Sequence, residues 1–502
     1  MALVKYEVYV FRDQRWILET SHREEGPAKA AAQSSLKDPK IAGVRVVREK
    51  RRPDGGFDEE ILFGALPQGG KKKDFSLAEI TVAPVCETLA DLYRSNSRAT
   101  ANRVLSRYLD DVVLTPTELL HHYRELKRLL DMDLAPAVVD RVATVQAALT
   151  QSDSRERRDR LQALLDQALK RARAAFTQNL PQRDEASFAQ VVDALAAHTP
   201  AEECDFLALT ALSRTLADVR IWTGKIAILL AEMDRAGDNA RAMGLLDGVL
   251  ADVIGARGVV AELFGTLPNL GALLLLMMDL INDALPLTGR APDDSLLRIN
   301  AHLAAGRLVE TRAAFVDYFQ RSLHAVTSLA KNEPRGEFES FRTLLERVVA
   351  RDGIFGGPDT VEAIMLRYVR FLNQGGVAGR REAIKAVTSH LPTALQQVRF
   401  LIALAETELG REQMDYTIST LEHLIGSAQR MEDLVGHKGT PRTRMQEIVL
   451  IDRFLHETTS LPARICAPLT EKLDALVAGF LADHQVIEKM DDPGDSLRVR
   501  AV

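Results

Sequence analysis

The sequence predicts a mainly α-helical protein: a large irregular helical array preceded by a small N-terminal α+β domain of ββαββ order. Three observations support this fold class. Alternation of apolar residues with period two is confined to about the first 65 residues. From about residue 76 onward, apolar residues recur at helical spacing. Gly and Pro number 30 and 19 among 502 residues, slightly below their usual combined share of about 12%, as expected of a mostly helical chain.

The first domain, residues 1–66, combines two strand pairs with one helix. Alternating side chains and turn residues such as Pro53-Asp54-Gly55-Gly56 separate its elements. We expect a small antiparallel sheet backed by the helix. The predicted strands cover 6–11, 16–20, 44–47 and 61–63, and the helix covers 26–37.

A linker is predicted at 67–75, because the sequence Pro67-Gln68-Gly69-Gly70 is followed by three lysines. The charge balance changes across this segment. Residues 1–73 contain 15 basic and 11 acidic residues, a net charge of +4, whereas the whole chain has a formal charge of −6. The helical region is therefore the acidic part of the protein.

Local signals mark individual helices after the linker. Thr115-Pro116-Thr117-Glu118 combines an N-cap, a proline at the first helical position and a capping-box glutamate, which predicts a helix through Leu130. Residues 161–176 carry an apolar stripe at i, i+3, i+4 and i+7. Further helices are predicted at 134–150, 185–198, 206–233, 240–254, 269–285, 294–305, 310–330, 336–351, 359–373, 379–390, 393–409, 411–428, 442–459 and 466–489.

Breaks near 179–184 and 353–358 predict three parts of the helical region: 76–180, 181–355 and 356–502. Short helices joined by short turns are typical of an α-solenoid, but no fixed repeat period is present. A solenoid-like array and separate bundles both remain open.

Composition excludes several classes of protein. Cysteine occurs only at Cys86, Cys204 and Cys466, without a C-x-x-C, which excludes a disulfide framework and predicts three small buried side chains. The longest apolar run, 270–278, is too short to cross a bilayer, and charges within the first 13 residues interrupt any signal peptide. These features predict a cytoplasmic, bacterial-like setting.

One E-x-x-H pair suggests a metal site. Glu118 and His121 lie three residues apart, and Glu125 follows one helical turn later, so a single helix face would offer three ligands. A di-iron bundle requires a second E-x-x-H copy, which the sequence lacks. The competing interpretation of His121-His122 is a solvated helical pair with one ring packed at an interface. No cofactor is expected.

Other motifs are weaker. Asp491-Asp492-Pro493-Gly494-Asp495 has the letters of the Mg²⁺-binding D-D-x-x-D motif, but Pro-Gly favours a turn and a helix cap. The glycine-rich stretch 375–381 ends in two arginines and could hold a phosphate at a helix N-terminus. P-loop, zincin and G-x-S-x-G motifs are absent from the sequence.

Basic residues of the N-terminal domain suggest nucleic-acid binding. The candidates are Arg48, Lys50, Arg51, Arg52, Lys71, Lys72 and Lys73. Aromatic residues of the predicted sheet could add stacking surfaces. The opposing argument is that these aromatics are needed to cover the domain's own helix, and that nearby acidic residues reduce the positive charge.

The leading hypothesis is a non-enzymatic cytoplasmic scaffold that binds protein partners along its helical surfaces, the partner being another protein or a second copy of itself. The apolar run 273–278 is expected to be core rather than a partner groove. Two alternatives belong to other classes: a nucleic-acid-associated regulator acting through the basic N-terminal domain, and a metal- or phosphate-dependent helical enzyme.

Overall fold

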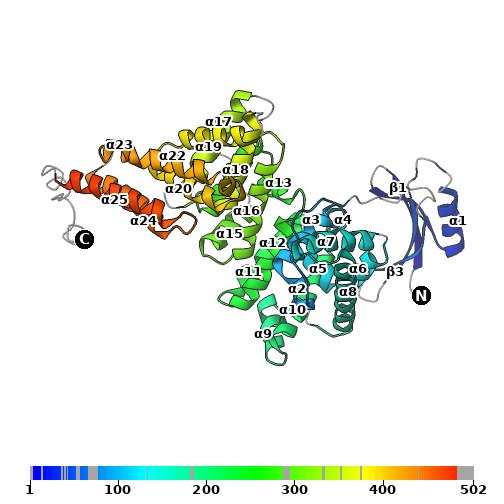
Figure 1. Cartoon of the computed structure of the whole chain (residues 1–502). Helices are drawn as coiled ribbons and strands as arrows, with labels where there is room; N and C mark the ends of the chain where they lie inside the picture. The colour runs from blue at the N-terminus through cyan, green and yellow to red at the C-terminus, as the bar shows by residue number, and fades with distance from the viewer. Residues whose placement is uncertain are drawn as a thin grey trace, which may run out of the picture. The chain divides into compact units, whose positions relative to one another are not determined.

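The computed structural model describes residues 4–12, 15–35, 38, 41, 43–51, 57–65, 77–132, 134–180, 186–285, 294–330, 334–350, 353–372, 376–438 and 440–482. The chain divides into two compact units, Met1–Ser76 and Leu77–Val502 (Figure 1). The first unit contains the sheet and the second is helical. The predicted mainly α-helical fold with a small N-terminal α+β domain is confirmed.

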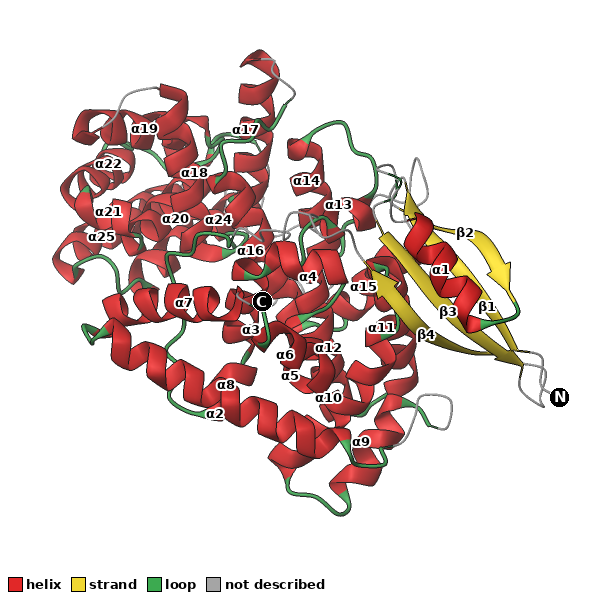
Figure 2. Cartoon of the chain, turned by 90° about the vertical axis from the view of Figure 1, so that its right-hand side faces the viewer, coloured by secondary structure: helices red, strands yellow, loops and turns green. Residues whose placement is uncertain are grey.

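The first unit has the predicted ββαββ order. Its elements are β1 (Val4–Arg12), β2 (Arg15–His22), α1 (Glu25–Ser35), β3 (Gly43–Arg51) and β4 (Phe57–Ala65). The strands form one antiparallel sheet in the order β2-β1-β3-β4. Helix α1 lies across one face of it, as Figure 2 shows. The small core contains valines at alternate positions of β1 and β3, together with Ala28 and Ala32 of the helix.

The second unit consists of helices joined by short connections. Their bounds are α2 (Leu89–Tyr93), α3 (Ser95–Val104), α4 (Ser106–Val112), α5 (Pro116–His121), α6 (Tyr123–Leu130), α7 (Leu134–Thr150), α8 (Ser154–Phe176), α9 (Phe188–Ala196), α10 (Ala201–Ala217), α11 (Trp222–Ala236), α12 (Ala240–Ile254), α13 (Val259–Phe264), α14 (Leu270–Ile281), α15 (Asp294–Ala304), α16 (Val309–His324), α17 (Pro334–Val348), α18 (Gly357–Leu372), α19 (Gly376–His390), α20 (Ala394–Glu406), α21 (Glu408–Glu412), α22 (Met414–Gly426), α23 (Glu432–Val435), α24 (Pro441–Glu457) and α25 (Ala463–Leu481).

Packing in the second unit runs through a chain of neighbouring helices. Helix α11 packs on α12, α12 on α16, α16 on α18, α18 on α20, and α20 on α24. One apolar core extends through these helices from Phe188 to Phe480, and it includes the predicted core residues Leu274, Met277 and Met278. A separate apolar cluster lies between the segment before α2 and helices α7 and α8. All three cysteines are buried free thiols, as predicted.

The predicted helix from Thr115 to Leu130 is wrong in one respect: it is two helices. The capping box at Thr115 and Glu118 is present, but the backbone becomes extended at His122, with φ −101° and ψ 103°. Helix α5 is buried against α10 and α3, whereas α6 packs on α7 and α8. These different tertiary contacts override the local helical propensity, since no glycine or proline marks the break.

The predicted helix 206–233 also divides in two. Helix α10 ends at Ala217 and α11 begins at Trp222. The connecting residue Arg220 donates from Nη1 to the backbone oxygen of Val112 at 2.8 Å. This bond ties the connection to the end of α4. By contrast, α7 and α12 coincide with the predictions for 134–150 and 240–254, because each presents a long apolar face.

Candidate functional site

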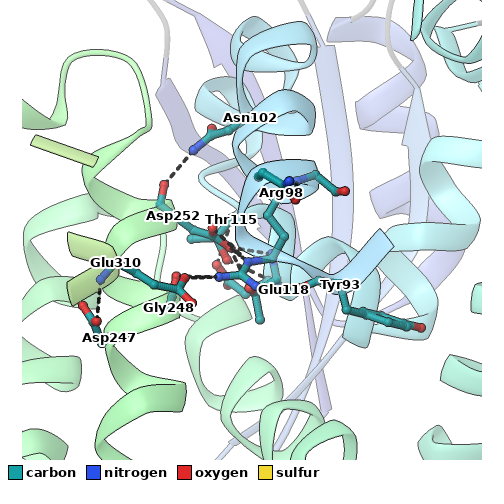
Figure 3. Close-up of polar contacts among 12 residues, drawn as sticks. Tyr93, Arg98, Asn102, Thr115, Glu118, Asp247, Gly248, Asp252 and Glu310 are labelled. Atoms are coloured by element: carbon teal, nitrogen blue, oxygen red, sulfur yellow. Dashed lines mark hydrogen bonds and ion pairs between the residues drawn. The ribbon is translucent and has the colours of Figure 1, made fainter. Parts of the chain in front are cut away.

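Arg98 on α3 is a nearly buried cation that joins three helices, as Figure 3 shows. Its Nε lies 3.1 Å from both carboxylate oxygens of Asp252 on α12. Its Nη1 donates to the Tyr93 backbone oxygen at 2.6 Å. Its Nη2 donates to Glu310 Oε2 on α16 at 2.8 Å and to the Gly248 backbone oxygen at 3.2 Å. One side chain therefore fixes α3 against helices that follow it by about 150 and 210 residues.

Gly248 on α12 and Gly255 at its C-terminal cap make this close contact possible. A Cβ at Gly248 would lie 2.9 Å from Arg98 Nη2, and a Cβ at Gly255 would lie 2.8 Å from Asn102 Nδ2. Asn102 donates from that nitrogen to the Asp252 backbone oxygen at 2.7 Å. The glycines thus allow α3 to approach α12 without displacing the polar groups.

Two aspartates of α12 bind the first turns of other helices. Asp252 Oδ2 accepts hydrogen bonds from Thr117 N at 3.0 Å and Thr117 Oγ1 at 2.6 Å, at the start of α5. Asp247 accepts from the backbone nitrogens of Glu310 and Thr311 at 2.7 and 2.9 Å, at the start of α16. These carboxylates satisfy amides that have no partner within their own helix. Their role in this geometry is to orient α5 and α16.

Glu118 forms a fully buried ion pair with Lys225 of α11. Both side chains have an exposed fraction of zero. Glu118 Oε2 also accepts from the Thr115 backbone nitrogen at 2.9 Å, while Lys225 Nζ donates to Oε1. Burial raises the pKa of Glu118 and lowers the pKa of Lys225, and each partner opposes the shift of the other. Both oxygens of the predicted metal ligand Glu118 are therefore engaged within the protein.

His121 is buried between two aromatic rings. Its ring centroid lies 5.2 Å from that of Tyr93 and 4.9 Å from that of Phe206. Its Nδ1 donates to the Thr117 backbone oxygen at 2.7 Å. Burial lowers the pKa of His121 to about 3, so the imidazole is neutral at pH 7. The packed-ring interpretation of the histidine pair describes this side chain well.

Glu125 does not continue the helix that carries the other two candidate ligands. It lies on α6, where it is 3.8 Å from both Arg128 and Arg220. Within the described ranges, no group of three or more His, Cys, Asp or Glu side chains is arranged to hold a metal ion. The three residues are thus near in sequence but are engaged with different partners.

A stability measurement against pH tests the state of His121. The unfolded chain binds a proton near pH 6.5, whereas folded His121 does so only near pH 3, so the folded state loses stability as the pH falls through that range. The loss is about 1.4 kcal/mol per pH unit. Between pH 7.5 and pH 5, we expect the wild type to lose about 2 kcal/mol more than His121→Gln in chemical denaturation. If the free energy of unfolding changed with pH by the same amount in both proteins, this would contradict the buried neutral state of His121.

A groove lies beside the Arg98 network. It has a volume of about 260 Å³ and is lined by residues of α3, α12 and α16. Asp317 accepts from Arg103 at 3.0 Å and from Arg321 at 2.8 Å, and burial raises the pKa of Glu310. Among the described lining residues, none is a histidine or cysteine. The groove offers paired charges rather than a nucleophile beside a base.

The glycine-rich helix start at Gly376 carries the two arginines of the predicted phosphate site. Arg380 forms an ion pair with Glu412, and Arg381 Nε donates to Gln413 Oε1 at 3.3 Å. Both guanidinium groups thus contact neighbouring helices. The aspartate-rich sequence 491–495 lies outside the described residues.

The basic candidates of the N-terminal domain divide between β3 and segments that are not described. Arg48, Lys50 and Arg51 belong to β3, while Arg52 and Lys71–Lys73 lie outside the described residues. The strand register places Arg48 opposite Glu60 and Lys50 opposite Asp58. Opposite charges at facing positions reduce the net positive charge of the sheet.

The sheet's aromatic residues are partly engaged within the unit. Tyr6 packs against the core below α1. The Tyr9 hydroxyl donates to Glu7 at 2.6 Å, and the Arg45 guanidinium lies 4.9 Å from the Tyr9 ring centroid. These contacts already occupy aromatic and basic side chains that a nucleic acid would bind. The nucleic-acid hypothesis stays a prediction.

An aromatic surface, defined here as Phe338, Phe341, Tyr368, Phe371 and His390, lies on α17, α18 and the end of α19. Phe338 and Phe371 are each 39% exposed, whereas Phe341 and Tyr368 are buried beneath them. Phe338 lies 5.1 Å from His390, and Phe341 lies 5.5 Å from Phe371, both edge to face. Phe371 thus packs against buried rings, whereas Phe338 packs against the partly buried ring of His390.

Comparison with protein-family models, with curated proteins and with solved structures finds no match to this chain. Among the described residues, no helix is both long enough and apolar enough to span a lipid bilayer. The functional proposal therefore depends on the geometry alone.

The sequence gives no separate signal for the residues of the Arg98 network. Arg98 and Lys225 lie in helices that also carry exposed or partly exposed charged residues, such as Arg103 and Arg235, and Asp252 resembles any acidic residue of an amphipathic helix. The capping-box pattern identifies Glu118, but not its partner on α11. A charged residue at a position of the apolar stripe of its helix is the one signal by which a sequence could indicate a buried charge.

Proposed function

We propose that the chain is a non-enzymatic cytoplasmic protein that binds protein partners through the surface of its helical unit. The observation that carries the proposal is the set of partners of the buried charged side chains. In the described part of the helical unit, these side chains bond to helix ends or to charges on neighbouring segments. This set comprises Asp91, Arg98, Glu118, Arg157, Lys225, Glu232, Asp247, Asp252, Arg367 and Arg399.

Buried charges that bond to neighbouring helices make the arrangement of the helices rigid. Arg367 is an example on α18: it donates to the backbone oxygens of Leu323 and Thr327 at 3.1 and 2.6 Å, and to Glu337 at 3.0 Å. These bonds close the end of α16 and fix α17 beside α18. A rigid array presents its surface side chains at fixed positions, which lowers the entropy cost of binding a partner.

The aromatic surface is the contact site that we propose. Aromatic residues and arginine are enriched at protein interfaces. Here Arg342 of α17, whose side chain is 59% exposed, lies near His390, whose pKa is lowered by burial and by this positive charge. The cytoplasmic setting is supported by the three free thiols. The partner would contact this surface with an apolar or aromatic protein segment.

Binding experiments with the full chain test this proposal. The double variant Phe338→Ser/Phe371→Ser removes the two half-exposed rings and leaves the buried rings in place. Loss of interface aromatic residues costs about 2 kcal/mol or more, so we expect partner affinity to fall by about 30-fold or more. Quantitative mass spectrometry of proteins captured by the tagged full chain gives the first measurement, and titration with the identified partner gives the second.

Leu149→Ser is the matched control, because Leu149 is an exposed apolar side chain on α7, away from the aromatic surface in sequence. It should retain the captured proteins. Sedimentation of the same three proteins shows whether the partner is a second copy of the chain. Equal capture by wild type and both variants would refute the proposed contact site, and no capture above background would refute the proposed function.

A further inference from the structure

An apolar cavity of about 120 Å³ lies inside the first bundle of the helical unit. Its walls come from α2, α3, α5, α6, α7, α8 and the segment before α2, which pack together in this part of the chain. Figure 1 shows these helices gathered in one region. Leucine, valine, alanine and proline side chains form nearly all of the lining, and Leu119, Leu129, Val139 and Leu161 are among its buried members.

The polar side chains of the lining bond within the protein. Ser97 Oγ donates to the Asp91 backbone oxygen at 2.6 Å, and Thr100 Oγ1 donates to the Asn96 backbone oxygen at 3.0 Å. Gln146 donates to the Pro84 backbone oxygen and accepts from Arg157 Nη2 at 3.0 Å. A polar ligand would find these groups already paired, and a water molecule needs two to four polar partners.

We propose that this cavity binds a small hydrocarbon group of about six carbons, either a single ring or the end of an alkyl chain. Protein interiors pack as densely as organic crystals, so a void of this size is unusual. An apolar cavity of about 150 Å³ stays dry and admits benzene. The volume, the apolar lining and the internal pairing of the polar groups all select the same class of ligand.

The bundle also offers a route of entry. Leu92, Leu130, Val138 and Val142 line the cavity and are only half-buried, so part of its wall reaches the surface. A free hydrocarbon would lie against the apolar lining. An amphiphile would place its alkyl end in the cavity and its polar head at this wall. This inference is independent of the aromatic surface, because the cavity lies in different helices.

Titration of the full chain with benzene, and separately with hexanoate, tests the proposal and distinguishes the two sources. We expect saturable shifts in the methyl NMR signals of Leu129, Val139 and Leu161. Benzene binding alone indicates a free hydrocarbon, whereas tighter binding of hexanoate indicates the tail of an amphiphile. If neither compound shifts these signals, the proposal is wrong.

Ala135→Leu places three more carbons at the cavity wall, because Ala135 lines it from α7. Each buried methylene changes affinity about fourfold, so we expect binding of the favoured probe to weaken by about tenfold or more. Ala137→Leu, at an exposed position on the same helix, should bind as the wild type does. Unchanged binding by Ala135→Leu would overturn the assignment. Should that variant not fold, Leu161→Ala enlarges the cavity and must gain binding of naphthalene relative to the wild type.

Discussion

Replacement of Lys225 by methionine is expected to lower the free energy of unfolding by about 3–5 kcal/mol at pH 7. Lys225 and Glu118 are both fully buried, so the variant leaves a carboxylate with no compensating charge in an apolar region. Methionine fills a volume similar to the lysine stem and creates no large cavity. Denaturant unfolding, monitored by circular dichroism of the full chain, measures the effect.

The double variant Glu118→Gln/Lys225→Met separates charge from packing. Glutamine can still accept from the Thr115 backbone nitrogen and so preserves the capping box. Because a buried ion pair is weak as a source of net stability, we expect the double variant to regain most of the loss. A single variant that costs less than about 1 kcal/mol, or a double variant as unstable as the single one, would contradict the buried ion pair.

Arg98→Met is expected to be about as destabilising, by about 3–5 kcal/mol. The Arg98 side chain is 10% exposed and the Asp252 side chain 4% exposed. Loss of the Arg98 guanidinium therefore leaves Asp252 as a buried carboxylate that retains only its hydrogen bonds from Thr117. It also removes the bond from α3 to Glu310. The same unfolding experiment measures the cost.

Arg103→Met provides the comparison on the same helix. Arg103 pairs with Asp317, but the two side chains are 37% and 38% exposed, and Asp317 keeps its bond to Arg321. An exposed ion pair contributes about 0.2–1 kcal/mol. If Arg98→Met costs no more than Arg103→Met, then Arg98 does not hold α3 against α12 and α16.

Local sequence signals predict those elements whose structure depends on local contacts. The period-two alternation of β1 and the Pro-Gly cluster after β3 predict the N-terminal sheet, and the capping box predicts where α5 begins. The end of α5 at His122 has no local signal. It depends on the different neighbours of α5 and α6, and those neighbours become apparent only when the chain is folded.

The candidate site is predictable only in part, for the same reason. Glu118 attracts attention because of its spacing to Thr115 and His121, but Lys225 lies 107 positions away on α11. A pair so distant in sequence depends on the packing of whole helices. Once formed, it makes the predicted metal ligand a structural residue, whereas His121 becomes a packed neutral ring.

In the proposed function, the buried charges fix the arrangement of the helices and the surface aromatics bind the partner. The charges set the positions of α3, α5, α12 and α16, whereas Phe338 of α17 and Phe371 of α18 are partly exposed at the surface. Partner binding by two folded variants tests this division most directly: Glu118→Gln/Lys225→Met changes the core, and Phe338→Ser/Phe371→Ser changes the surface. We expect the core variant to bind the partner as the wild type does and the surface variant to lose binding. Loss of binding in the folded core variant, with normal binding in the surface variant, would contradict it.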